Sequence, residues 1–144
     1  MANNSFYNMI LTDHNLHPAH KHGLECANFC HEGINPSCGD DIVLNLDIRD
    51  GVIRDGSYTG SGCAVSQASA DIMLDLVIGK TVEEAAKISQ DFMAMIKGEA
   101  DEETLEQLDE AAALQDIAHM PSRVKCAVLG WHTLEELIKQ SEEQ

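Results

Sequence analysis

Residues 42–59, IVLNLDIRDGVIRDGSYT, decide the fold class of this chain. Apolar and polar residues alternate over residues 42–49, so an extended strand there has one apolar face and one polar face. Asp50-Gly51 then separates this run from a second one, and this dipeptide is typical of the two-residue turn of a β-hairpin. The stretch therefore predicts two antiparallel strands with one buried face.

Two further elements are predicted upstream of the hairpin. Apolar residues spaced three and four apart predict a short amphipathic helix over residues 5–15. Residues 24–32, LECANFCHE, predict a strand, and on that reading Cys26, Asn28 and Cys30 share one face of it.

Downstream of the hairpin the apolar period becomes helical. A helix is predicted that ends at Gly79, and the capping box formed by Thr81 and Glu84 predicts the start of another, which runs to about Lys97. A last helix is predicted from Pro121, because proline suits the first turn of a helix.

The helical half also contains an acidic segment. Residues 98–122 contain eight acidic residues and no Lys or Arg, which predicts one or two short solvent-facing helices. Gly130 interrupts the apolar stripe of the last helix and indicates close packing there. Together the elements predict one domain over residues 1–144 of class α+β, with a small antiparallel β-sheet packed on one side by several α-helices and an acidic helical insertion at about 98–122.

The charge of the chain restricts its partners. Nine Lys and Arg stand against 25 Asp and Glu in 144 residues, for a formal net charge of -16. Such a surface repels nucleic acid phosphates and anionic membranes, so we expect neither as a partner. The sequence has no apolar run long enough to span a bilayer and no secretory leader, and a cytoplasmic location is expected. In a reducing compartment, five cysteines favour metal ligands, catalytic thiols or core residues over disulfides.

Four residues at the ends of predicted elements form a candidate metal site. Cys38 and Asp40 precede the hairpin, Cys63 lies at the start of the first long helix, and Cys126 lies near the start of the last one. Three thiolates and one carboxylate suit tetrahedral zinc, or iron with sulfide. The spacing alone leaves an alternative open, in which Cys38 lies in an ordinary turn and the other cysteines are small core residues.

The charge of this ligand set predicts outer partners. Three thiolates and a carboxylate carry a charge of −4, and a divalent ion leaves about −2. Arg123 and Lys125 flank Cys126 in a chain that has few basic residues. We therefore expect them to offset the excess charge and to hold Asp40 in place.

Three segments of the chain resemble a known family. NPSCGDDI (35–42), GSGCAVSQASADIM (60–73) and MPSRVKCAVLGW (120–131) are similar, in this order, to the signature segments of the IscU/NifU N-terminal family of iron–sulfur assembly proteins. The opening YNMILTDHNLHP (7–18) also resembles the start of that family. The similarity runs from about residue 7 to residue 131 and implies a SufE/NifU-like fold.

Within that family, two features resemble the SufU type. Lys125 stands where IscU scaffolds have a histidine before the third cysteine, and the stretch between Cys63 and Cys126 is longer than in IscU. The resemblance implies zinc held by Cys38, Asp40, Cys63 and Cys126. It also implies that Cys38 accepts persulfide sulfur from a SufS-type cysteine desulfurase, a histidine of which takes its place on the zinc, and that the sulfur passes to the SufBCD complex. The alternative is an IscU-like scaffold on which a [2Fe–2S] cluster is assembled, but a lysine at position 125 is a poor cluster ligand.

A histidine-rich segment, residues 14–31, departs from the pattern of the family. It includes Cys26 and Cys30, which the resemblance does not assign as ligands. One interpretation is a second metal or redox site, although two cysteines four residues apart on an extended strand are about 13 Å apart, too far for one ion or a disulfide. The other is a partly buried strand with incidental cysteines beside a histidine-rich loop.

Overall fold

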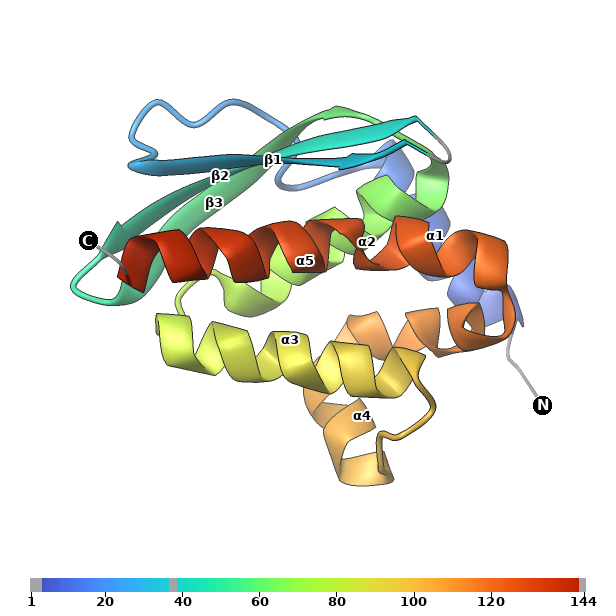
Figure 1. Cartoon of the computed structure of the whole chain (residues 1–144). Coiled ribbons are helices and arrows are strands. Elements are labelled where there is room, and N and C mark those ends of the chain that lie inside the picture. The colour runs from blue at the N-terminus through green and yellow to red at the C-terminus, as the bar shows by residue number, and fades with distance from the viewer. Residues whose placement is uncertain (1–3, 37–38, 143–144) are drawn as a thin grey trace.

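The predicted hairpin forms two strands of a three-stranded antiparallel sheet in the computed structural model, which describes residues 4–36 and 39–142. The strand order is β1-β2-β3, so each strand pairs with its neighbour along the chain (Figure 1). The strands are β1 (Phe29–Asn35), β2 (Asp40–Arg49) and β3 (Val52–Ser61).

The turn and the buried face of the hairpin agree with the prediction. Asp50 and Gly51 both have positive φ, 54° and 73°, as the two central residues of a type I′ turn require. The apolar residues of β2 alternate with less buried ones and enter the core: Ile42, Leu44, Leu46 and Ile48.

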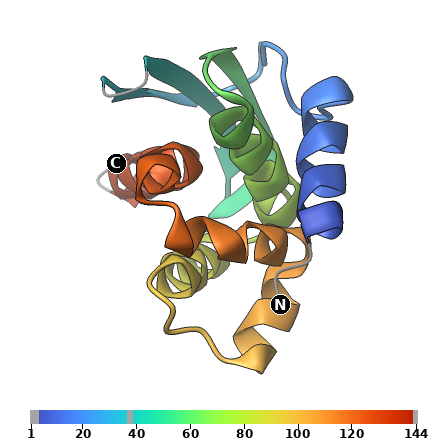
Figure 2. The ribbon, with the colours of Figure 1, turned by 90° about the vertical axis from the view of Figure 1, so that its right-hand side faces the viewer.

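Helices cover one face of this sheet. Figures 1 and 2 show α2 and α5 against the sheet, and α3 with the acidic segment on the far side of α5. The predicted α+β class, with helices on one side of a small antiparallel sheet, is confirmed. The helices are α1 (Asn4–Leu16), α2 (Ala64–Val77), α3 (Val82–Ile96), α4 (Glu102–Leu108), the 3-10 helix η1 (Asp109–His119) and α5 (Pro121–Glu142).

The start of α3 has the predicted capping box. Thr81 Oγ1 accepts the N–H of Glu84 at 3.1 Å, and the N–H of Thr81 donates to Glu84 Oε1 at 3.0 Å. The backbone hydrogen bond from Thr81 holds the pKa of the Glu84 carboxyl below its usual value. The sequence signal and the local structure therefore agree at this boundary.

The core between α2 and α5 is tightly packed. Trp131 is fully buried and stacks on Phe92 with ring centroids 4.3 Å apart. Its Nε1–H donates to Ser69 Oγ at 3.1 Å, and this hydroxyl donates to the carbonyl of Ala127 at 2.6 Å. A Cβ added at Gly130 would lie 3.3 Å from the Cβ of Ala70, so the close packing predicted at this glycine is confirmed.

The strand predicted over residues 24–32 is displaced along the chain. Ala27 N–H donates to the carbonyl of Leu24 at 3.2 Å, which makes a turn of the first residues. The side chain of Asn28 bonds to both backbone groups of Ile48, so it takes the place of ladder hydrogen bonds next to the first residue of β1. Cys26 therefore lies outside the strand, and its predicted common face with Cys30 is wrong.

The acidic segment is less solvated than its charge indicates. It forms α4 and η1, but η1 contributes several fully buried side chains to the core. The predicted short helices are present, but they are amphipathic, and one side of the segment packs into the core rather than facing solvent. The side chains that reach the core are Leu108, Ala111, Leu114 and Ile117. Among the described residues, no helix has the length and apolar character that would be needed to cross a membrane.

Candidate metal centre

Three of the four predicted ligands meet at one place. Asp40 is the first residue of β2, Cys63 is the N-cap of α2, and Cys126 lies in the second turn of α5. One carboxylate oxygen and the two Sγ atoms all lie within 4.8 Å of one another. The fourth predicted ligand, Cys38, lies outside the described residues.

Asp40 is buried and oriented by the backbone. Its exposed fraction is 0%, and its Oδ1 accepts the N–H of Cys63 at 2.8 Å. Burial of a carboxylate is costly unless hydrogen bonds or a positive charge compensate it. The Cys63 N–H supplies one such hydrogen bond and orients the carboxylate beside the thiol.

Cys63 combines the role of a helix cap with that of a ligand. Its Sγ accepts the N–H of Ser66 at 3.4 Å, and it lies 4.0 Å from Asp40 Oδ2. The positive end of the α2 dipole stabilises a thiolate at this position. The contribution of Ser66 was not predicted, because it is a backbone N–H that almost any residue at this position supplies.

Cys126 is held by the packing of α2 against α5. Its side chain is buried, with 2% exposed. The Ser69 hydroxyl joins α2 to the Ala127 carbonyl of α5, one residue beyond the thiol. The separation of the two thiol-bearing helices is therefore fixed by the core, independently of any ion.

Two glycines let the chain approach the site closely. Gly39, just before Asp40, has φ of +71°, which a residue with a side chain adopts only at a cost. A Cβ at Gly62 would lie 2.8 Å from Asp40 Oδ1 and 2.5 Å from Ser66 Oγ, so only glycine leaves room for the carboxylate there. The role of Gly62 was not predicted from the sequence.

The donor set fits a zinc ion. Zinc bonds of about 2.3 Å to sulfur and 2.0–2.2 Å to oxygen, at tetrahedral angles, place neighbouring ligand atoms roughly 3.5–3.8 Å apart. The described ligand atoms lie within 4.8 Å, so small side-chain adjustments bring them to that spacing. Two soft sulfurs and one carboxylate also match the ligands that zinc prefers.

The outer partners predicted from the sequence lie at the surface. Arg123 and Lys125 are exposed in the first two turns of α5. Among the described residues, no hydrogen bond or ion pair links either side chain to Asp40, and their role as outer partners stays a prediction. Beside the site, a hydrogen bond with Asp41 raises the pKa of the Glu32 carboxyl.

The other two described cysteines lie apart from this cluster. Cys26 and Cys30 are exposed, and no disulfide joins any two of the four cysteines that the structure describes. Neither belongs to a group of three potential ligands within residues 4–36 and 39–142. The second metal or redox site considered for this pair therefore stays without structural support.

Asp40→Asn is expected to weaken zinc binding without unfolding the chain. The amide oxygen still accepts the N–H of Cys63, but the negative charge on the metal side is lost. We expect the apparent zinc affinity to fall at least about tenfold, measured by competition with a chromophoric chelator. In Asp40→Ala the hydrogen bond is lost as well, so its melting temperature should fall further; equal zinc affinity in wild type and both variants would contradict the ligand role.

The sequence matches a known protein family over almost its whole length. The family profile of the NifU-like N terminal domain matches residues 6–144, which include all four predicted ligands. The chain belongs to this family. The NifU-like N-terminal domain family contains iron–sulfur cluster assembly proteins, and the resemblance found in the three signature segments is therefore confirmed.

Proteins similar to this chain include a scaffold protein and a sulfurtransferase. The "Iron-sulfur cluster assembly scaffold protein IscU" of Thermotoga maritima is 42% identical over 117 residues, 81% of each chain. The "Zinc-dependent sulfurtransferase SufU" of Bacillus subtilis is 32% identical over 138 residues, 96% of this chain and 92% of the relative. The crystal structure of FiSufU from Fervidobacterium islandicum has a TM-score of 0.83 and 34% identity, and the match covers 94% of this chain and 98% of that one.

Proposed function

We propose that this protein is a zinc-dependent sulfur acceptor in iron–sulfur cluster assembly. It takes persulfide sulfur from a SufS-type cysteine desulfurase and passes it to a SufBCD assembly complex. One observation carries the proposal, which is the convergence of Asp40, Cys63 and Cys126 from three separate elements. The name of the Bacillus subtilis relative, a zinc-dependent sulfurtransferase, supports the same activity.

The proposed site has a resident ion and a reactive thiol. Asp40, Cys63 and Cys126, with Cys38, would hold zinc, which keeps thiols deprotonated at neutral pH. Asp40 is positioned by the Cys63 N–H, and Cys126 by the helix packing. Of the three described ligands, Cys63 is the least buried.

The proposed transfer is a thiol–disulfide exchange. The Cys38 thiolate attacks the terminal sulfur of the desulfurase persulfide and forms a new S–S bond. The S–S bond within the donor breaks, and the desulfurase cysteine leaves as a thiolate with the electron pair. The sulfur keeps its oxidation state, so the step needs no added oxidant or reductant.

The second candidate function is a scaffold that holds a [2Fe–2S] cluster. The Thermotoga maritima relative, with its 42% identity, has a scaffold name. Three thiolates and one further ligand also suit an iron–sulfur cluster. Lys125 argues against it, because an ammonium group is a poor cluster ligand and the side chain is exposed on α5.

Metal content and sulfur transfer, measured together, test the proposal. The protein is purified with and without oxygen, its metals and visible spectrum are measured, and it is incubated with a SufS-type desulfurase and ³⁵S-labelled cysteine. We expect zinc at one ion per chain, no colour, and label on the chain that depends on the desulfurase. Iron with a brown chromophore would favour the scaffold, and zinc without label would leave a purely structural metal site.

A further inference from the structure

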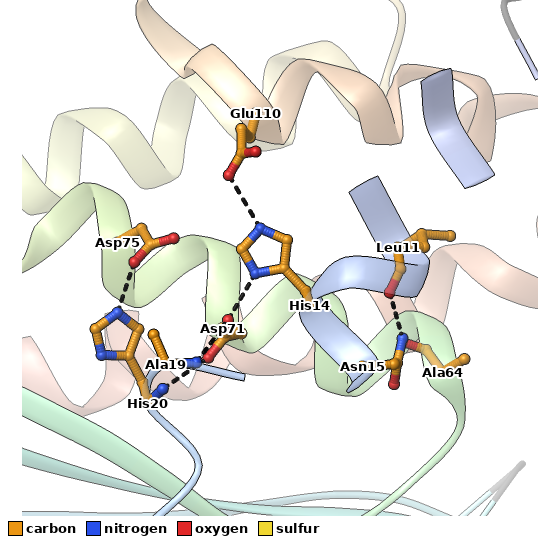
Figure 3. Close-up of polar contacts among 9 residues, drawn as sticks. All are labelled: Leu11, His14, Asn15, Ala19, His20, Ala64, Asp71, Asp75 and Glu110. Carbon is orange, nitrogen blue, oxygen red and sulfur yellow. Dashed lines mark hydrogen bonds and ion pairs between the residues drawn. The ribbon is translucent and has the colours of Figure 1, made fainter. Parts of the chain in front are cut away.

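A second cluster of potential ligands lies where α1, α2 and η1 meet. It contains two imidazoles and three carboxylates and is separate from the cysteine site in residues and in chemistry. Figure 3 shows these side chains pointing toward one another. They are His14 on α1, His20 in the segment after it, Asp71 and Asp75 on α2, and Glu110 on η1.

Asp71 fixes the orientation of the His14 ring. It is fully buried, and its two oxygens accept the backbone N–H groups of His20 at 2.9 Å and Ala19 at 3.4 Å. The same carboxylate lies 2.6 Å from His14 Nδ1 (Figure 3). Because an ionised carboxylate only accepts hydrogen bonds, Nδ1 carries a proton. The other nitrogen, Nε2, faces the Glu110 carboxylate, so either a proton or a metal ion lies between these two atoms.

Three ligand atoms surround the space in front of Nε2. Glu110 Oε1 lies 3.0 Å from Nε2, and single ligand atoms of His14, Asp75 and Glu110 all lie within 4.8 Å of one another. His14 is buried, whereas the side chains of Asp75 and Glu110 are each 42% exposed. The set is therefore anchored by a buried imidazole and open to water on the carboxylate side.

The arrangement matches the design of histidine metal sites. A histidine ligand commonly donates its second ring N–H to a carboxylate, which fixes the tautomer and makes the ligand nitrogen more basic. Asp71 has this position relative to His14. His20 Nε2 lies 2.6 Å from Asp75 Oδ1, and this contact orients the Asp75 carboxylate.

Charge also favours a cation here. Asp71, Asp75 and Glu110 carry three negative charges, and the hydrogen bonds and ion pairs described for them include imidazoles but no Lys or Arg. The chain as a whole has a formal net charge of -16. At His14 Nε2, a divalent ion would bring two positive charges where a proton brings one.

We propose that His14 Nε2, Asp75 and Glu110 bind a divalent first-row transition-metal ion, with Asp71 and His20 as positioning residues. One imidazole and two carboxylates leave coordination positions open to water, and they suit harder ions such as Mn²⁺ better than thiolates do. The ion would connect η1 of the acidic segment to α1 and α2. On this proposal, His14 and His20 of the histidine-rich segment take part in metal binding.

A proton competes with the ion for the same nitrogen. Burial disfavours the charged ring of His14, but hydrogen bonds with Asp71 and Glu110 outweigh burial and raise its pKa. An imidazolium that bridges Asp71 and Glu110 is the competing explanation of the geometry.

Titration with Mn²⁺ tests the proposal. Protein that already carries zinc at the cysteine site is titrated with Mn²⁺, and free Mn²⁺ is followed by electron paramagnetic resonance. We expect one Mn²⁺ per wild-type chain, and at least about tenfold weaker binding in Glu110→Gln and in Asp71→Asn. The zinc content of Glu110→Gln should match wild type, since Glu110 lies outside the cysteine site.

Glu103→Gln is the matched control. It makes the same charge change in the same acidic segment, at an exposed position of α4, and should leave Mn²⁺ binding unchanged. If Glu103→Gln and Glu110→Gln weaken Mn²⁺ binding equally, the effect comes from the overall negative charge of the segment, and the proposal is overturned. The proposal is also overturned if the wild-type chain binds no Mn²⁺ and the ¹⁵N chemical shifts of the His14 ring are those of an imidazolium.

Discussion

Cys63→Ser is expected to remove zinc from the cysteine site and to leave α2 intact. Serine is among the best N-cap residues, and its Oγ can accept the Ser66 N–H as the sulfur does. Its hydroxyl stays neutral at physiological pH and is a poor zinc ligand. Because even the outer partners of a metal site are worth about 10–100-fold in affinity, we expect zinc affinity to fall by more than about 100-fold.

Metal analysis and thermal unfolding of this variant separate the two roles of Cys63. With zinc removed from both proteins by a chelator, the melting temperatures of the variant and of wild type should agree closely, because the cap is preserved. Cys26→Ser is the matched control, since it makes the same change at an exposed cysteine outside the cluster. Full zinc occupancy in Cys63→Ser would contradict the ligand assignment.

Cys38→Ala is expected to abolish sulfur acceptance from the desulfurase. The acceptor must be a thiolate, and alanine has no group that can attack a persulfide. Transfer of ³⁵S from labelled cysteine should fall to the level seen without this protein. Peptide mapping of the wild-type chain should place the label on the peptide that contains Cys38.

Cys30→Ala controls for the loss of a thiol in general. Cys30 is exposed on β1, so its removal tests whether any accessible cysteine accepts the label. We expect its labelling to equal that of wild type. Undiminished labelling of Cys38→Ala, or label on a peptide with another cysteine, would refute the acceptor assignment.

The parts of the fold that local sequence determines were predictable. The alternation of Ile42, Leu44 and Leu46 places them on one face, and Asp50-Gly51 supplies the positive φ values of the turn. In both cases the residues that decide the structure are only a few positions apart in the sequence, so a local pattern predicts it directly.

Two errors arose where distant residues decide the structure. The side chain of Asn28 bonds to Ile48, twenty residues away, and shifts the start of β1. The acidic segment was predicted to form short solvent-facing helices, but Leu114 and Ile117 pack into the core and Glu110 pairs with His14. A charge count over the segment cannot show which of its faces another helix covers.

The sequence predicted which residues form the candidate site better than it predicted how they are arranged. Asp40, Cys63 and Cys126 come together as the family resemblance implied, although spacing alone left an ordinary turn and core cysteines open. The space that Gly62 leaves for the Asp40 carboxylate depends on how β3 leads into α2, and no local pattern reports it. The cluster around His14 was equally hidden, because its members are spread from α1 to η1.

Gly130 links the spacing of Cys63 and Cys126 to the packing of the hydrophobic core. It lies one helical turn from Cys126, and an added methyl group there would lie 3.3 Å from Ala70 on the helix that begins at Cys63. A larger residue would push the two helices apart by a few tenths of an ångström. The distance between the two thiols is therefore sensitive to a substitution in the core that touches neither cysteine.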